Sequence, residues 1–110
     1  MYFVYMVRCE DESLYTGIAA DLARRMREHK ARNALCARYT RSHPVAALAA
    51  AWQAETRSDA LRLEALIKRL TRAQKLALAA APETLDAVFG EKLRGASFAP
   101  LSPSARQRCF

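Results

Sequence analysis

Cysteine and glycine are scarce in this chain, and it has no long hydrophobic run. Three of its 110 residues are cysteine and three are glycine. Cys9, Cys36 and Cys109 lie far apart and form no C-x-x-C pair, which argues against a disulfide framework and a zinc finger. No apolar run approaches the roughly 20 residues that cross a bilayer, and no signal sequence precedes the first strand-like run. These absences predict a cytoplasmic protein with no membrane partner.

Positive charge, in contrast, is abundant. Eighteen Lys and Arg residues against eleven Asp and Glu give a formal net charge of +7. Such an excess favours a polyanionic partner, and nucleic acid is the first candidate. The chain is 52% hydrophobic and long enough to fold as one domain without disulfides or a structural metal.

The first 30 residues predict a hairpin followed by a helix. Tyr2–Cys9 is almost continuously apolar and predicts a strand buried on both faces. A polar turn leads to a second short strand over Leu14–Ile18, in which Gly17 indicates a bend or a close approach of two backbones. Asp21 is placed to cap a helix over Leu22–Lys30.

The middle of the chain predicts a loop, a strand and a helix. Residues 31–44 lack periodicity and predict a basic loop with room for a helical turn. Alanines in residues 45–55 favour helix, but a position between two capped helices favours a third strand, and strand is our prediction. Ser58 and Asp59 open a helix over residues 59–70.

The last third predicts two more helices and a tail. Thr71 and Gln74 form a capping-box pattern for a helix that ends near Pro82. Residues 83–89 predict a short further helix. Beyond Gly90 few apolar residues recur periodically, which predicts an extended or flexible tail.

A helical wheel places two basic side chains on the apolar face of the first helix. With Leu22 at zero, Met26 falls at about +40°, His29 at about −20° and Arg25 at about −60°. A guanidinium directed at the sheet must be paired or must line a wet cleft, because an unpaired buried charge is prohibitively costly. Arg25 and His29 are therefore candidate site residues.

Three more polar side chains join this set. Glu64 lies at the border of the apolar face of the helix over residues 59–70, where it can pair with a basic group or ligate a hard cation. Tyr5 and Tyr15 share one face of the hairpin if Tyr15 lies opposite Val7. Two phenols, a guanidinium, an imidazole and a carboxylate form a set that can cleave phosphodiesters.

Each of these residues, taken alone, has a structural explanation. The tyrosines can be ordinary core residues, and His29 can be a buried histidine with satisfied hydrogen bonds. Arg25 and Glu64 can form a structural ion pair, or Glu64 can pair with Lys68. Their joint order along the chain favours a site over five separate coincidences.

The segments SLYTGIAADLARRMREH, ARYTRSHPV and RLEALIKRLTRAQK together resemble the GIY-YIG nuclease superfamily, and within it the small single-domain bacterial YhbQ-like group. The resemblance covers roughly residues 2–80. The first family signature ends at Tyr5, with Phe3 where a glycine is usual, and the second is Tyr15-Thr16-Gly17. The helix arginine of the family matches Arg25.

The resemblance implies an α/β domain over residues 1–81, with a three-stranded mixed or antiparallel sheet flanked by helices, and a C-terminal extension over residues 82–110. It also implies a hydrolase: a DNA endonuclease of repair, or of the processing of structured or single-stranded DNA, that uses one Mg²⁺ or Mn²⁺ ion and leaves 5′-phosphate and 3′-hydroxyl ends. A non-catalytic nucleic-acid-binding or adaptor module of the same fold is the alternative.

In that interpretation Glu64 holds the metal, Arg25 stabilises charge on the phosphoryl oxygens, and Tyr5 orients water or phosphate. Tyr15 and His29 are both candidates for the general base. DNA is the predicted partner, with RNA left open, for a monomer or weak dimer that can recruit a protein through its C-terminal tail. The predicted nucleic-acid contacts are Gly17, Lys30, Arg38, Tyr39, Arg41 and Lys68.

Overall fold

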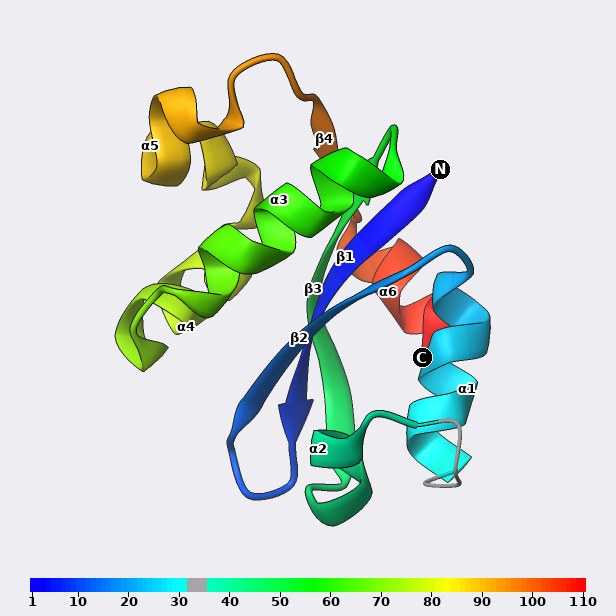
Figure 1. Ribbon diagram of the computed structural model, residues 1–110. Coiled ribbons are helices and arrows are strands. Elements are labelled where there is room, and N and C mark those ends of the chain that lie inside the picture. Colours follow the sequence, from blue (N-terminus) through cyan, green and yellow to red (C-terminus); the bar gives the residue numbers. More distant parts are fainter. Residues whose placement is uncertain (32–35) are drawn as a thin grey trace.

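A four-stranded antiparallel sheet forms the centre of the molecule (Figure 1). The computed structural model describes residues 1–31 and 36–110. The strands are β1 (Tyr2–Cys9), β2 (Leu14–Ala19), β3 (Val45–Ala54) and β4 (Phe98–Pro100), in the spatial order β2-β1-β3-β4. The α/β class and the third strand are confirmed, but the sheet has a fourth strand that the sequence did not predict.

The register of the hairpin places both signature tyrosines on one face of the sheet. Val7 lies opposite Tyr15, and Tyr5 lies opposite Gly17, as the alternation of side chains along paired strands requires. Val4 and Met6 point to the other face. The predicted register is therefore confirmed.

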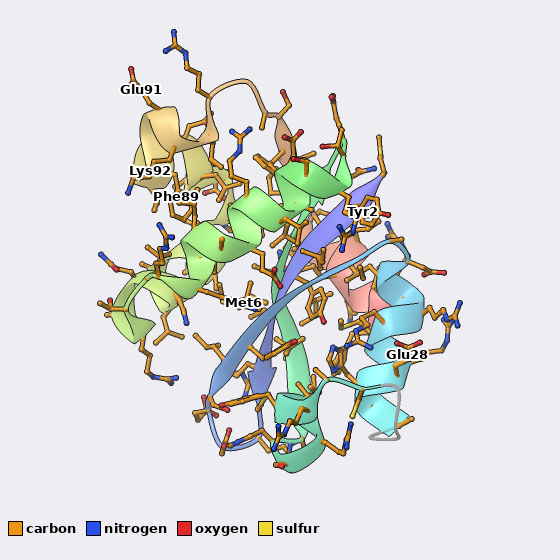
Figure 2. All side chains as sticks on the ribbon, in the orientation of Figure 1. Tyr2, Met6, Glu28, Phe89, Glu91 and Lys92 are labelled. Atoms are coloured by element: carbon orange, nitrogen blue, oxygen red, sulfur yellow. The ribbon has the colours of Figure 1, made fainter. Side chains whose placement is uncertain are left out.

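Helices α3 (Arg57–Lys68), α4 (Arg72–Ala80) and α5 (Leu85–Phe89) cover the face that carries Met6 (Figures 1 and 2). The predicted capping box of α4 is present, with Thr71 and Gln74 bonding each other's backbone N–H groups. The predicted start of α3 was wrong by two residues. The Thr56 hydroxyl accepts from the N–H of Asp59 and caps the helix. The buried side chains of this core are Val4, Met6, Ala50, Trp52, Ala54, Ala60, Leu63, Ile67, Leu78, Leu85, Phe89 and Leu93.

Helices α1 (Leu22–Ala31) and α6 (Pro103–Cys109) lie on the opposite face (Figure 1). Asp21 caps α1 as predicted, because its carboxylate accepts from the N–H of Arg24 at 3.0 Å. Leu22 and Met26 are buried against the sheet. Tyr5, Val7, Leu48 and Ala51 complete this second core.

Helix α2 (Arg38–Ser42) supplies the helical turn expected in the basic loop. It lies at the end of the sheet near the β1–β2 turn (Figure 1). The remaining part of that predicted loop includes residues 32–35, which are outside the described residues.

The C-terminal residues form more structure than the expected short helix and extended or flexible tail. Two 3₁₀ helices (Pro82–Thr84 and Gly90–Leu93) flank α5, and β4 and α6 follow. Single apolar residues without a period hold this segment: Phe98 packs on one core, and Leu101 and Phe110 on the other. Within residues 1–31 and 36–110, no helix is long and apolar enough to span a membrane.

Candidate active site

Tyr5 is the central residue of the candidate site. It lies in the middle of β1 and is 1% exposed. Its hydroxyl is 2.8 Å from Nε2 of His29 and accepts from Nε of Arg25 at 3.4 Å. The strand and α1 thus bring together three of the five predicted catalytic residues.

Gly17 gives the Tyr5 hydroxyl the room that it occupies. A Cβ atom at position 17 would lie 2.5 Å from Oη of Tyr5, closer than real Cβ contacts allow. The glycine of the second signature therefore permits a phenol to lie flat against β2. The predicted contact of Gly17 with nucleic acid stays a prediction.

His29 is fully buried and bonded at both ring nitrogens. Nε2 contacts Tyr5, and Nδ1 is 2.7 Å from Oγ1 of Thr40 in α2. The Thr40 hydroxyl in turn donates to the carbonyl of Ala37 at 3.1 Å. Sequence reasoning missed Thr40 as a partner of His29, because no periodicity signals a contact between a helix and a turn that follows a loop.

Burial holds Tyr5 and His29 in their uncharged forms. Desolvation raises the pKa of Tyr5 to about 12, although the Arg25 charge opposes the rise. Desolvation, assisted by the Arg25 charge, lowers the pKa of His29 to about 4. At neutral pH the pair is a phenol and a neutral imidazole.

Arg25 lies at the edge of this cluster with its side chain 23% exposed. Its Nη1 donates to Oε1 of Glu28 at 2.7 Å on the same helix, where Figure 2 labels Glu28. Burial alone would lower the pKa of Arg25, but its hydrogen bonds to Glu28 and Tyr5 outweigh burial and raise it. Arg25 is therefore a permanent cation beside the phenol.

Tyr15 lies next to Tyr5 and His29, with ring centroids 6.4 Å and 5.9 Å away. Its ring stacks on Tyr39 at 5.7 Å, and Tyr39 stacks on His43 at 4.0 Å. Nδ1 of His43 contacts a carboxylate oxygen of Asp11 at 2.6 Å. A line of three near-parallel rings thus runs from the site to the surface.

Glu64 lies on α3, where it pairs with Lys68. Its side chain is 18% exposed, and Oε2 lies 3.4 Å from Nζ of Lys68. The carboxylate is near enough to Tyr5 to contribute, weakly, to the raised pKa of that phenol. A single partly exposed carboxylate fits a hard cation that keeps several water ligands. Among residues 1–31 and 36–110, no three His, Cys, Asp or Glu side chains gather as a metal cluster.

The predicted nucleic-acid contacts divide into two groups. Lys30 donates to the backbone oxygen of Phe110 at 2.5 Å and lies over its ring, and Lys68 pairs with Glu64. Arg38, Tyr39 and Arg41 are exposed on α2. The surface beside Tyr15 is therefore basic and aromatic.

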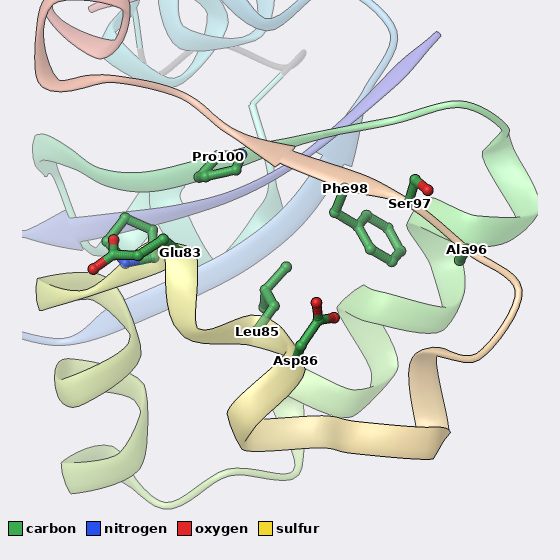
Figure 3. Close-up of a pocket in the computed structure, with 8 residues that line it drawn as sticks. Glu83, Leu85, Asp86, Ala96, Ser97, Phe98 and Pro100 are labelled. Carbon is green, nitrogen blue, oxygen red and sulfur yellow. The ribbon is translucent and has the colours of Figure 1, made fainter.

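A separate hollow lies between α5 and β4 (Figure 3). It carries two carboxylates, and none of the predicted site residues lines it. Its wall consists of Pro82, Glu83, Leu85, Asp86, Ala96, Ser97, Phe98 and Pro100.

Comparison with known proteins shows which family model and which relatives this chain matches. The model of the GIY-YIG catalytic domain matches residues 1–77. The UPF0213 protein FN1575 of Fusobacterium nucleatum is 39% identical over 83 residues, which cover 76% of this chain and 81% of the relative. The UPF0213 protein YhbQ of Salmonella typhimurium is 40% identical over 88 residues, covering 80% and 86%.

A solved structure also matches. It is the solution NMR structure of the UPF0213 protein BH0048 from Bacillus halodurans, at 33% sequence identity and a TM-score of 0.47. The match covers 78% of this chain and 96% of that one.

Proposed function

This chain belongs to the GIY-YIG catalytic domain family, in the UPF0213 group that includes YhbQ, and from that membership we propose that it is a divalent-metal-dependent DNA endonuclease. The observation that carries the proposal is the contact of the Tyr5 hydroxyl with both His29 and Arg25. A buried phenol between a neutral base and a fixed cation suits proton removal beside a negatively charged phosphate. The proposed substrate is structured or single-stranded DNA, in repair or processing.

His29 is the proposed base, and it acts through Tyr5. Its ring is fully buried with both nitrogens bonded, so its route to a water molecule runs through the phenol. In the attack step, water gives a proton to Oη of Tyr5 while Tyr5 gives its own proton to Nε2 of His29. The hydroxide forms the new P–O bond, and the 3′ oxygen leaves and takes a proton from solvent. Tyr15 is the alternative base.

Arg25 is the proposed stabiliser of the transition state. Its guanidinium is a permanent cation, partly exposed, and oriented by Glu28 and Tyr5. Charge develops on the phosphoryl oxygens during attack, and a donor placed there acts most strongly at that moment. Losing such a donor typically costs on the order of 10² to 10³ in rate.

GIY-YIG nucleases generally use a divalent metal ion. Glu64 is the residue that would hold it here, because a partly exposed carboxylate beside the site is an oxygen ligand of the kind Mg²⁺ and Mn²⁺ prefer. When bound, the ion would supply Lewis-acid stabilisation of the scissile phosphate and the leaving oxygen. Lys68, now paired with Glu64, would then be available to a phosphate.

We propose that residues 1–81 form the catalytic unit and residues 82–110 an extension packed on it. The proposed DNA surface is the α2 side of the site, where Arg38, Tyr39 and Arg41 are exposed. Positive side chains there attract the phosphate backbone of DNA.

The test is a cleavage assay on single-stranded, duplex, flapped and branched DNA, with Mg²⁺, Mn²⁺ or EDTA. The wild type is compared with Glu64→Gln and with Glu55→Gln, a control on the same side-chain type at an exposed position. Metal-dependent cutting that Glu64→Gln abolishes and Glu55→Gln retains supports the proposal. Binding without cutting on every substrate would favour the adaptor alternative.

A further inference from the structure

We propose that Thr40 is a positioning residue that holds the His29 imidazole in its Nδ1–H form, so that Nε2 is free to accept the Tyr5 proton. The proposal rests on the proposed function for its catalytic consequence. Its structural content, the tautomer of His29, stands on hydrogen-bond geometry alone. The residue belongs to α2, which sequence reasoning assigned to DNA contact.

Thr40 is one of three buried polar residues in the part of the chain that the structure describes, with Thr16 and His29. It is 0% exposed, so water does not reach its hydroxyl. The oxygen lies 2.7 Å from Nδ1 of His29 and 3.1 Å from the carbonyl of Ala37. A hydroxyl has one proton, and only one of these contacts can use it.

The donor-to-acceptor direction of these hydrogen bonds is indicated by the Arg25 and Tyr5 end of the network. Nε of Arg25 can only donate, so the Tyr5 oxygen is its acceptor. The Tyr5 proton then points to Nε2 of His29, the acceptor within reach. This direction leaves Nε2 without a proton and puts the proton of the neutral ring on Nδ1, where the buried N–H needs the Thr40 oxygen as its acceptor.

Thr40 continues the series of hydrogen bonds in the same donor-to-acceptor direction. It accepts from Nδ1–H and donates its own proton to the carbonyl of Ala37. The three protons of this series, on Tyr5, His29 and Thr40, then each have one acceptor, and the carbonyl of Ala37 is the last of them. In the reverse direction Tyr5 would receive two donors and its own proton would have no acceptor in this series, at a buried position where that is costly.

The tautomer matters for the reaction because the second ring nitrogen decides what the first can do. With Nδ1–H held by Thr40, Nε2 takes the Tyr5 proton and the ring becomes an imidazolium without rotating. The proton returns to solvent through Tyr5 after product leaves. A ring protonated at Nε2 would instead donate to Tyr5 and could not accept from it.

A structural role is the competing explanation, since the bond to Ala37 also stabilises the turn into α2. The chain offers a matched control for that role. Thr84 makes the same hydroxyl-to-carbonyl bond three residues back, to Ala81 at 2.6 Å, and has no histidine partner. Thr84→Val removes that bond far from the site, while Thr40→Val removes the bond and the acceptor for His29.

The deciding measurement is the tautomer of His29 at pH 7, from long-range ¹H–¹⁵N correlation spectra of the imidazole. We expect the Nδ1–H form in the wild type, in Thr40→Ser and in Thr84→Val, and its loss in Thr40→Val. An Nε2–H ring in the wild type, or an Nδ1–H ring that persists in Thr40→Val, overturns the proposal. Should Thr40→Val not fold, Thr40→Ala takes its place. This measurement needs no nuclease activity, so its failure is distinct from failure of the proposed function.

Cleavage kinetics give the catalytic consequence. Thr40→Val should lower kcat on the order of tenfold to a hundredfold with KM nearly unchanged, because Thr40 is fully buried and out of reach of a bound substrate. Thr40→Ser should restore most of the rate, and Thr84→Val should leave it unchanged. An equal loss in Thr40→Ser, or a change in KM alone, would contradict a positioning role.

Discussion

At the scale of single residues, the centre of the site is a buried polar network of Tyr5, His29 and Thr40, with the Arg25 cation and its partner Glu28 at the edge. Among the described residues, no buried side-chain nitrogen or oxygen is left without a hydrogen-bond partner. Such a network is stable only when it is complete, because each unpaired group in a low-dielectric interior is costly. The effect of changing one member should therefore exceed the strength of one hydrogen bond.

The buried neutral state of His29 predicts a pH dependence of stability. Its pKa is about 4 in the folded protein and 6.5 for a solvated histidine of the unfolded chain, so the unfolded chain binds the proton first as the pH falls. Stability is then lost between pH 6.5 and pH 4. From pH 7 to pH 5 the free energy of unfolding should fall by about 2 kcal/mol.

Urea unfolding at the two pH values measures this loss. His29→Gln should remove most of the slope, whereas His43→Gln, at the partly exposed histidine, should retain it. A wild-type stability that is flat from pH 7 to pH 5 would contradict the buried neutral imidazole.

Gly17→Ala tests the close approach of Tyr5 to β2. The added Cβ would meet the Tyr5 hydroxyl at 2.5 Å, so the phenol must move away from His29 and Arg25. We expect a loss of stability of about 1 to 3 kcal/mol and a larger loss of kcat. Ala19→Gly, also on β2, is a control for backbone effects. A Gly17→Ala protein that is active and fully stable would contradict the close approach of the Tyr5 hydroxyl to Gly17.

The sequence predicted the positions of single side chains correctly where a helical or strand period determined which face they occupy. The helical wheel found Arg25 and His29 because both face the sheet among apolar neighbours, and alternation placed Tyr5 and Tyr15 on one face. Neither pattern could identify Thr40, because its contact with His29 depends on how α1 and α2 pack against each other in space. The catalytic roles of these residues stay predictions.

At the scale of elements, α2 has an importance that its five residues do not suggest. Thr40 holds His29 and the neighbouring Tyr39 stacks on Tyr15, so one turn of helix contacts both proposed bases. The sequence indicated a basic loop here, since a short helix has too few residues to show a period. The apolar-rich strand β3 was predicted correctly because its position between helices outweighed its alanines.

The start of α3 gives an element-scale prediction. Thr56 has extended backbone angles and its hydroxyl accepts from the N–H of Asp59, so it is the N-cap. Thr56→Ala should lower the free energy of unfolding by about 1 kcal/mol. Ser58→Ala should change it little, because Ser58 lies inside the first turn. Equal losses in the two variants, measured by thermal or urea unfolding, would contradict this cap.

At the scale of the whole molecule, the C-terminal residues close both cores. β4 extends the sheet beside β3, Phe98 packs on the α3 side and Leu101 on the α1 side. Sequence reasoning expected a tail because these anchors do not recur at a helical or strand period. Their effect depends on long-range contacts, which a local pattern does not contain.

Substitution of these anchors measures that contribution. Phe98→Ala and Leu101→Ala should each lower the free energy of unfolding by about 1 to 3 kcal/mol, less than for fully buried side chains. Ala99→Ser, between them and exposed, is the control. Unchanged stability in all three variants would show that the segment is not part of the cooperative fold.

The measurement that tests the central claim most directly is DNA cleavage by Tyr5→Phe, which removes one oxygen atom and keeps the ring. The account predicts that kcat falls on the order of 10² to 10⁴, because the water loses its route to His29. The affinity for DNA should stay close to that of Tyr2→Phe, a control on the same strand, while the melting temperature falls below that of the control because His29 and Arg25 lose the Tyr5 hydroxyl as a partner. Tyr5→Phe that folds and cleaves DNA at the wild-type rate would contradict the account.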